Sequence, residues 1–308
     1  MIKLSLKYRP ERLEELVGQD WAKTLLAPLF RSGKEKKDYQ TMLFYGQSGV
    51  GKTTMARIVA NRLNAEVYEL DASTHNGVED IRKIQQTIKR KPIARDNIVI
   101  ILDECHMLSK SAFNALLKTL EEPPEYVYFI LCTTEVDKVP ITVVHRCLEV
   151  RLMTLSVDEV VSLLYDVAQK EKIKITDEEA RKLAKNCEGS ARNALNLLEE
   201  FALTGQITVT EEEDVAQLIL LYSGTAQGVE VRLIKHLNSM YRKGNTPINI
   251  INKACNLIVI KIFEEDKPEY VPLLNQLLAI QMKLNSERYH LNDYLVNLMV
   301  NDMLQRRK

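Results

Sequence analysis

The residues best suited to chemistry lie between Gly46 and Thr53, where the chain reads Gly-Gln-Ser-Gly-Val-Gly-Lys-Thr and matches G-x-x-x-x-G-K-[ST] at every fixed position. Glycines let the backbone turn its N–H groups toward phosphate oxygens, and a helix N-terminus adds partial positive charge. Lys52 is expected to reach the β- and γ-phosphates of ATP, and Thr53 to bind Mg²⁺. The alternative is a chance glycine turn. The predicted loop contacts are Gly46, Gln47, Ser48, Gly49, Val50, Gly51, Lys52, Thr53 and Thr54.

A pair of carboxylates follows the apolar run Ile98–Leu102, at Asp103 and Glu104. A buried strand that ends in two acids places them at the edge of a parallel sheet where ligands bind. We expect Asp103 to hold Mg²⁺ and Glu104 to polarise the attacking water. On its own the pair could be a solvated acidic loop, but the glycine-rich loop about fifty residues earlier favours a joint ATP-hydrolysing site.

The same acids belong to Asp103-Glu-Cys-His106, which also spells the box of a superfamily of nucleic-acid helicases. Those helicases need a second domain of similar fold with its own arginine motif. The second half of this chain has a helical pattern with no second parallel-sheet signature, so the helicase interpretation is disfavoured.

The elements that must position these residues alternate along the first half of the chain. Apolar runs typical of strands occur at 42–45, 67–70, 98–102 and 127–132, and helical spacing occurs from 52 to about 63, from 78 to about 91 and from 109 to 120. Strands that alternate with helices predict a parallel sheet with helices on both faces.

From about Ser156 onward the pattern becomes helical. Ser156-Val-Asp-Glu159 and Thr176-Asp-Glu-Glu179 are capping boxes that open two helices. Gly189–Ser190 interrupts the chain before another helix, and about four longer helices are expected after Ser223–Gly224. The predicted fold class is therefore α/β followed by all-α.

Composition narrows the functions that the chain can have. Its 308 residues suffice for two or three domains, and 42 Lys and Arg balance 42 Asp and Glu. That balance argues against coating nucleic acid or membrane through bulk charge. The five cysteines form no C-x-x-C pair, which is typical of free thiols, and no segment has the roughly 20 apolar residues of a membrane span. A cytoplasmic location is expected.

Several further segments, in this order along the chain, resemble the clamp-loader ATPases of the AAA+ class. The resemblance is to the bacterial DNA polymerase III gamma/tau subunit and to the replication factor C small subunit, and it covers residues 1 to about 220. The segments are Lys7–Pro10, Val17–Gln19, Phe113–Pro124, Val127–Thr134, Pro140–Cys147 and Gly189–Leu195.

The resemblance implies roles for individual residues. Thr134 is similar to the first sensor, which positions the attacking water, although the adjacent Thr133 could occupy that register. Arg146 is similar to the arginine finger, which acts on ATP bound by the neighbouring subunit. Arg192 is similar to the second sensor, which contacts the γ-phosphate from the lid of the same chain. The implied adenine pocket is lined by Tyr8, Arg9, Pro10, Val17 and Gly18.

Two features depart from the family. His145 precedes Arg146 where the family usually has serine, which leaves the presentation of the finger open. The gamma/tau subunit carries a four-cysteine zinc insert between its phosphate motifs, whereas this chain has no cysteine between Lys52 and Asp103. No zinc is therefore expected.

The implied partners are primer–template DNA, a sliding clamp and other loader subunits, in a pentamer that is expected to be mixed. DNA contacts would come from two helices and the residues that lead into them, through phosphate binding that is independent of sequence. A solvated basic helix face is the alternative. The candidate DNA contacts are Arg82, Lys83, Lys89, Arg90, Ser109 and Lys110.

The expected function is therefore an ATPase motor that loads a clamp in DNA replication, with ATP and Mg²⁺. The expected domains are the ATPase domain (1–153), a helical lid (154–221) and a helical collar (222–308). One alternative is a branch-migration or fork-remodelling motor, although no extra DNA-binding module is evident. The other is a structural loader subunit, which is disfavoured because the residues of both phosphate motifs are intact.

Overall fold

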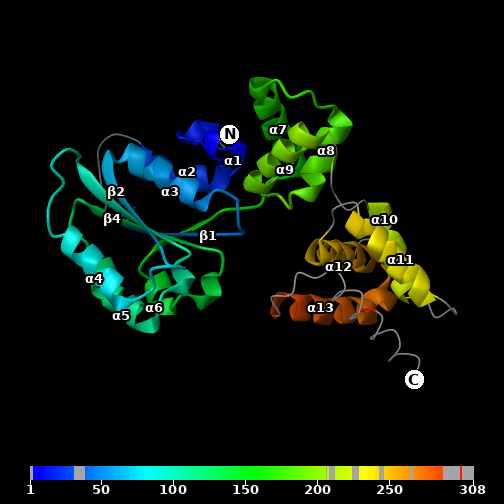
Figure 1. Ribbon diagram of the computed structural model, residues 1–308. Coiled ribbons are helices and arrows are strands. Elements are labelled where there is room, and N and C mark those ends of the chain that lie inside the picture. Colours follow the sequence, from blue (N-terminus) through cyan, green and yellow to red (C-terminus); the bar gives the residue numbers. More distant parts are fainter. Residues whose placement is uncertain are drawn as a thin grey trace. The chain divides into compact units, whose positions relative to one another are not determined.

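The computed structural model describes residues 3–30, 39–205, 212–223, 229–242, 246–263 and 266–286, with the single positions 207 and 299. The chain forms two compact units, residues 1–205 and 206–308 (Figure 1). The first unit contains a sheet and three following helices, and the described part of the second is helical. The predicted change from α/β to all-α is confirmed.

The sheet of the first unit is parallel, with the strand order β2-β3-β4-β1-β5. Because all strands run the same way, their carboxyl ends meet at one edge. The register places Tyr45 opposite Thr133 and Asp71 opposite Asp103. The strands are β1 (Thr41–Tyr45), β2 (Ala65–Asp71), β3 (Asn97–Asp103), β4 (Val127–Thr133) and β5 (Leu148–Arg151).

Helices cover both faces of this sheet, and Figure 1 shows α2 and α3 on one face with α4, α5 and α6 on the other. The helices are α1 (Leu4–Lys7), α2 (Asp20–Phe30), α3 (Lys52–Arg62), α4 (Val78–Thr87), α5 (Lys110–Glu121) and α6 (Ile141–Val144). Short 3₁₀ turns are η1 (Leu13–Glu15), η3 (Cys105–Met107) and η4 (Val136–Lys138).

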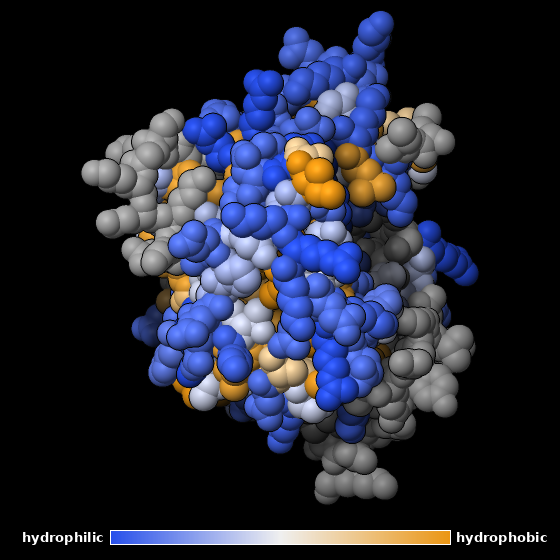
Figure 2. Space-filling model, turned by 90° about the vertical axis from the view of Figure 1, so that its left-hand side faces the viewer, coloured by the Kyte–Doolittle hydropathy of each residue, from blue (hydrophilic) through white to orange (hydrophobic). Residues whose placement is uncertain are grey.

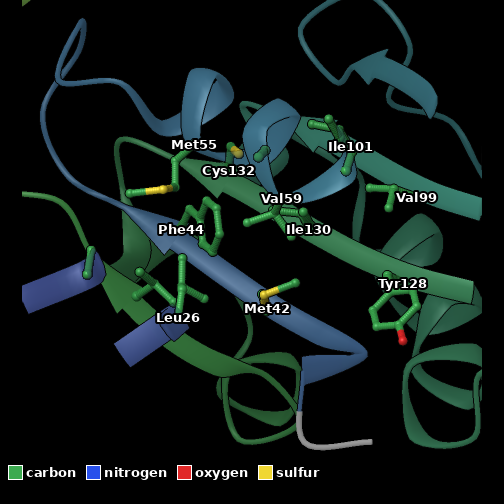
Figure 3. Close-up of a cluster of buried hydrophobic side chains, with 14 of the residues drawn as sticks. Leu26, Met42, Phe44, Met55, Val59, Val99, Ile101, Tyr128, Ile130 and Cys132 are labelled. Atoms are coloured by element: carbon green, nitrogen blue, oxygen red, sulfur yellow. The ribbon is translucent and has the colours of Figure 1, made fainter. Parts of the chain in front are cut away.

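The apolar runs of the strands supply two cores because successive side chains point to opposite faces. Phe44, Ile101 and Ile130 pack with α2 and α3 in the core drawn in Figure 3. Leu43 and Ile100 belong to the core on the other face. Burial on both faces explains why the central strands are continuously apolar.

Three helices complete the first unit: α7 (Val157–Glu171), α8 (Asp177–Asn186) and α9 (Ala191–Thr204). Both predicted capping boxes are confirmed, since the Ser156 and Thr176 hydroxyls accept hydrogen bonds from the N–H groups of Glu159 and Glu179.

The described part of the second unit has its own core, which includes Leu237, Ile251 and Leu277. None of the described helices is long and apolar enough to cross a bilayer. The elements are α10 (Glu212–Ser223), α11 (Val229–Arg242), α12 (Pro247–Phe263), η5 (Pro268–Tyr270) and α13 (Val271–Ser286).

Some expectations need correction. The helix expected to reach about residue 91 ends at Thr87, so Lys89 and Arg90 lie beyond α4. Strand β5 and helix α2 were not predicted. The three-domain division remains a prediction, and α10, which contains its second boundary, packs against α11 and α12.

Candidate nucleotide-binding site

The glycine-rich loop connects β1 to the first residue of α3, as the motif requires. At two glycines of this loop, the backbone has a positive φ and a side chain would collide with neighbouring atoms. A Cβ at Gly46, where φ is 150°, would lie 2.2 Å from the carbonyl oxygen of Leu152. A Cβ at Gly49, where φ is 76°, would lie 2.1 Å from the Ser190 hydroxyl oxygen. The loop can therefore adopt this turn, close against its neighbours, only with glycine at these positions.

Lys52 is almost completely buried inside the loop. Its ammonium donates hydrogen bonds to the carbonyl oxygens of Gly46 (3.0 Å) and Gln47 (2.9 Å). Burial lowers the pKa of Lys52, and the nearby carboxylates of Glu104 and Asp103 oppose that effect. An ammonium has three N–H donors, so a phosphate can be added to the two carbonyl partners. The loop and its lysine fit a phosphate group.

The two residues predicted to hold Mg²⁺ are in direct contact. The Thr53 hydroxyl, from the start of α3, donates to Oδ2 of Asp103, at the end of β3, over 2.8 Å. Hydroxyl and carboxylate oxygens are hard ligands of the kind that Mg²⁺ takes alongside phosphate oxygens and water. The donor set therefore fits magnesium.

Glu104 lies immediately beyond β3 in a left-handed backbone conformation (φ 46°). Its Oε2 accepts a hydrogen bond from the Thr134 hydroxyl over 3.1 Å. The hydroxyl of Thr133 is instead buried and accepts from the N–H of Glu135. Of the two threonines left open by the sequence, Thr134 is the one that contacts Glu104.

His106 is a residue at this site whose role the sequence did not reveal. Its side chain is 7% exposed, and its Nδ1 lies 3.0 Å from Thr133 Oγ1 and 3.4 Å from Glu104 Oε2. Its Nε2 lies 3.2 Å from Glu135 Oε1. The only sequence signal was its place in the Asp-Glu-Cys-His box, which was assessed as a helicase motif.

A cavity of about 940 Å³ opens where the N-terminal segment, the glycine-rich loop, the acidic pair and α9 meet. At its wall, Arg9 Nε donates to the Thr54 hydroxyl over 3.1 Å, and burial lowers the pKa of Arg9. Gly18 packs beside Leu155 and Glu159 instead. The predicted residues that line the cavity are Tyr8, Arg9, Pro10, Val17, Ser48, Gly49, Val50, Gly51, Lys52, Thr53, Thr54, Asp103, Glu104 and Arg192.

Arg192 reaches this cavity because the start of α9 touches the loop. Ser190 caps α9 by accepting a hydrogen bond from the N–H of Asn193, and the N–H of Arg192 donates to the Gly49 carbonyl over 3.4 Å. A side chain from the helical segment therefore shares a cavity with Lys52, although their positions are far apart in the chain.

Arg146 is not among the residues that line the cavity. It follows α6, and its Nε donates to Glu121 at the end of α5 over 2.7 Å. Its side chain keeps one third of its surface exposed. Of the predicted catalytic side chains, Lys52, Asp103, Glu104 and Arg192 line the cavity. Thr134 does not line it but contacts Glu104, whereas Arg146 neither lines it nor bonds to a residue that does.

The candidate DNA contacts lie in two places. On α4, Arg82 and Lys83 form ion pairs with Glu79 (2.5 Å) and Asp80 (3.2 Å) of the same helix. Lys89 and Arg90 are exposed just beyond that helix. Ser109 caps α5, and Lys110 is its first residue. Figure 2 shows a face that is mainly hydrophilic where the described residues are coloured, with small separate hydrophobic groups.

Comparison with known protein sequences finds relatives that are described as DNA polymerase III subunits. A family model described as DNA polymerase III, delta subunit, matches residues 66–156. The chain is 36% identical over 231 residues to the DNA polymerase III subunit tau/gamma of Haemophilus influenzae, covering 67% of this chain and 33% of that one. It is 29% identical over 317 residues to the DNA polymerase III subunit gamma of Buchnera aphidicola subsp. Baizongia pistaciae, covering 94% and 83%. The chain thus spans about one third of the length of the Haemophilus protein.

Among solved structures, the chain is similar to the Thermotoga maritima RuvB Holliday junction branch migration motor. The TM-score is 0.55 at 20% identity, over 84% of this chain and 80% of that one. At this identity the likeness shows the fold alone.

Proposed function

Because the chain belongs to the family of the DNA polymerase III gamma and tau subunits, we propose that it is an ATPase subunit of a clamp loader, which uses ATP binding and DNA-stimulated hydrolysis to place a sliding clamp on primer–template DNA. The proposal rests on the observation that the glycine-rich loop, the acidic pair and Arg192 all line one cavity. A phosphate-binding loop without a nearby acid and a lid arginine would support nucleotide binding only.

In the proposed mechanism the protein positions charge more than it forms bonds. Backbone N–H groups of the loop and Lys52 hold the phosphates of ATP. Thr53 and Asp103 are the residues that would hold Mg²⁺, which neutralises phosphate charge when bound. Glu104, held by Thr134, orients the attacking water.

Arg192 supplies a second positive charge at the γ-phosphate from the same chain. Arg146 supplies a third, but we assign it to the ATP site of the neighbouring subunit in a mixed pentamer. Its position outside the cavity of its own chain supports that assignment. The proposed location is the cytoplasm.

The alternatives have less support. A branch-migration motor shares the fold, but 20% identity carries no function. A structural subunit would not need the contact between Thr53 and Asp103 or the buried Lys52.

Steady-state ATP hydrolysis tests the proposal, measured with and without primer–template DNA and a clamp. We compare the wild type, Arg146→Ala and the control Arg181→Ala, which removes an exposed arginine that is also ion-paired. DNA and clamp together should raise the wild-type rate, and Arg146→Ala should remove most of the rise while ATP still binds. The control should behave like the wild type. A rate that follows DNA alone would favour the remodelling motor, and no hydrolysis in the complete assembly would contradict the ATPase assignment.

A further inference from the structure

His106 occupies the point where the ends of β3 and β4 come together. Its ring is held by contacts at both nitrogens, with Thr133 Oγ1 3.0 Å from Nδ1 and Glu135 Oε1 3.2 Å from Nε2. Glu135 is itself fixed by an ion pair with Lys138 over 2.7 Å. A ring that is buried and restrained on both sides cannot turn independently of the end of β4.

The Glu104 carboxylate faces this restrained ring. Its Oε2 lies 3.4 Å from His106 Nδ1 and accepts the Thr134 hydroxyl over 3.1 Å. The left-handed backbone at Glu104, with φ 46° and ψ 44°, is a conformation that costs a non-glycine residue energy and persists only where its surroundings hold it. The carboxylate itself has two side-chain contacts, with the Thr134 hydroxyl and the His106 ring.

The two nitrogens of the His106 ring face different residues. Nδ1 is the atom that faces both Glu104 and Thr133, whereas Nε2 faces Glu135. A neutral imidazole carries one N–H, so a proton on Nδ1 directs a donor to Thr133 and Glu104, while a proton on Nε2 directs it to Glu135. Any influence of the ring on Glu104 must therefore come through Nδ1.

We propose that His106 is a positioning residue that sets the direction of the Glu104 carboxylate and joins it to the end of β4. The ring is not among the residues that line the cavity, so it acts through Glu104 and not on ATP. This inference rests on the proposed function, because the direction of Glu104 affects a rate only if that carboxylate orients the attacking water. Displacement of a catalytic group by about 1 Å can cost up to about a hundredfold in rate.

Variants that retain one side of the ring test the proposal. An asparagine amide can replace Nδ1, and a glutamine amide can replace Nε2. We expect His106→Ala to lower kcat about tenfold with the Kd for ATP changed less than about twofold, because Lys52 and the loop hold the nucleotide. His106→Asn should recover most of the loss and His106→Gln should not. His236→Ala, which removes a histidine of the second unit that contacts the Asp214 carbonyl, is the control.

A second comparison separates positioning from a general loss of structure. If His106 acts through Glu104, His106→Ala should cause no further loss of kcat in a Glu104→Gln background. Additive losses, equal rescue by Asn and Gln, a kcat unchanged in the Ala variant, or a Kd that weakens in parallel with kcat would each overturn the proposal.

Crystal structures of the wild type and of His106→Ala provide a readout that does not depend on hydrolysis. We expect the Glu104 carboxylate of the variant to have moved away from the Thr134 hydroxyl. An unmoved carboxylate would overturn the role of His106 whatever the rate. A wild type that shows no hydrolysis in any assembly would instead contradict the proposed function, and the crystal structures would still decide the role of His106.

Discussion

Lys52 is a buried cation whose surroundings fit a phosphate group. A buried ammonium is costly unless it is hydrogen-bonded, and here its partners are two carbonyls of the loop that it follows. Desolvation lowers the pKa of Lys52. A bound phosphate would raise that pKa again, because its negative charge favours the charged ammonium. Arg146, in contrast, is partly exposed, and its ion pair with Glu121 is of a kind worth at most about 1 kcal/mol. That pair would not prevent Arg146 from acting at the ATP site of another subunit, as we propose.

We expect Lys52→Ala to weaken ATP binding by about tenfold to a hundredfold, because hydrogen bonds to charged groups are worth about 1.5–3 kcal/mol. Isothermal titration of ATP into each protein measures the loss. Lys185→Ala, which removes an exposed lysine of α8, should leave the Kd unchanged. Equal affinities of Lys52→Ala and the wild type would contradict the phosphate role.

A second prediction concerns the metal. Asp103→Asn should raise the Mg²⁺ concentration that half-saturates hydrolysis by at least about tenfold, since the loss of a charged ligand is worth more than about 1.4 kcal/mol. ATP binding measured in EDTA should change little. The matched control is Asp137→Asn, which changes an exposed aspartate. If Asp103→Asn keeps its Mg²⁺ requirement, Asp103 does not hold the metal.

At the scale of elements, the contact between the glycine-rich loop and the start of α9 joins the phosphate site to the helical segment. Ser190 is 4% exposed and both caps α9 and occupies the space that a side chain at Gly49 would need. Because the N–H of Arg192 donates to the Gly49 carbonyl, we expect a change in the conformation of the loop to shift Arg192 as well.

This contact predicts that substitutions at Gly49 and Ser190 have non-additive effects on the free energy of unfolding. Gly49→Ala should destabilise the protein by about 1–3 kcal/mol, through its left-handed φ and its collision with the Ser190 hydroxyl. Ser190→Ala should cost about 1 kcal/mol because it removes the cap of α9. The double variant should lose less than the sum, because the collision is relieved. Urea denaturation of the four proteins measures the cycle, and strict additivity would show that the two residues do not meet.

Strong local signals allowed much of the architecture to be predicted. Buried parallel strands are continuously apolar, and the capping boxes at Ser156 and Thr176 mark helix starts through side-chain chemistry. Strand β5 was missed because its alternation of apolar and polar residues, Leu-Glu-Val-Arg, lasts only four residues, the shortest length at which such a pattern indicates a strand.

The site was only partly predictable for a related reason. Spacing identified Lys52 and Asp103, but a choice between Thr133 and Thr134 depends on which hydroxyl points toward Glu104. His106 gave no signal beyond its place in the Asp-Glu-Cys-His box, because its partners Thr133 and Glu135 lie at the end of a different strand. Such contacts arise from strand register, which one sequence does not reveal.

At the scale of the whole molecule, the two units have separate cores, which indicates that each can fold without the other. We propose that the helices after the lid form the collar that joins subunits. The proposed boundaries remain at residues 153 and 221, although α10 packs with the helices of the second unit.

We expect a fragment of residues 1–205 to fold, to bind ATP with the affinity of the full chain and to be monomeric. Its hydrolysis should fall strongly, because no neighbouring Arg146 reaches its site. Light scattering, ATP titration and a hydrolysis assay, each with the full chain as control, measure these properties. A folded fragment that assembles like the full chain would refute the collar.

The position of β1 between β4 and β5 also affects how the protein folds during synthesis. This strand pairs with β4 and β5, and about one hundred residues separate Tyr45 from Leu148. At a synthesis rate of about 5–20 residues per second, β1 waits roughly 5–20 s for both neighbours. During that time its apolar residues and unpaired backbone groups are available to other chains. The strand order, which places β1 between two strands that are synthesised later, therefore exposes the nascent chain to contacts that a chaperone on the ribosome would prevent.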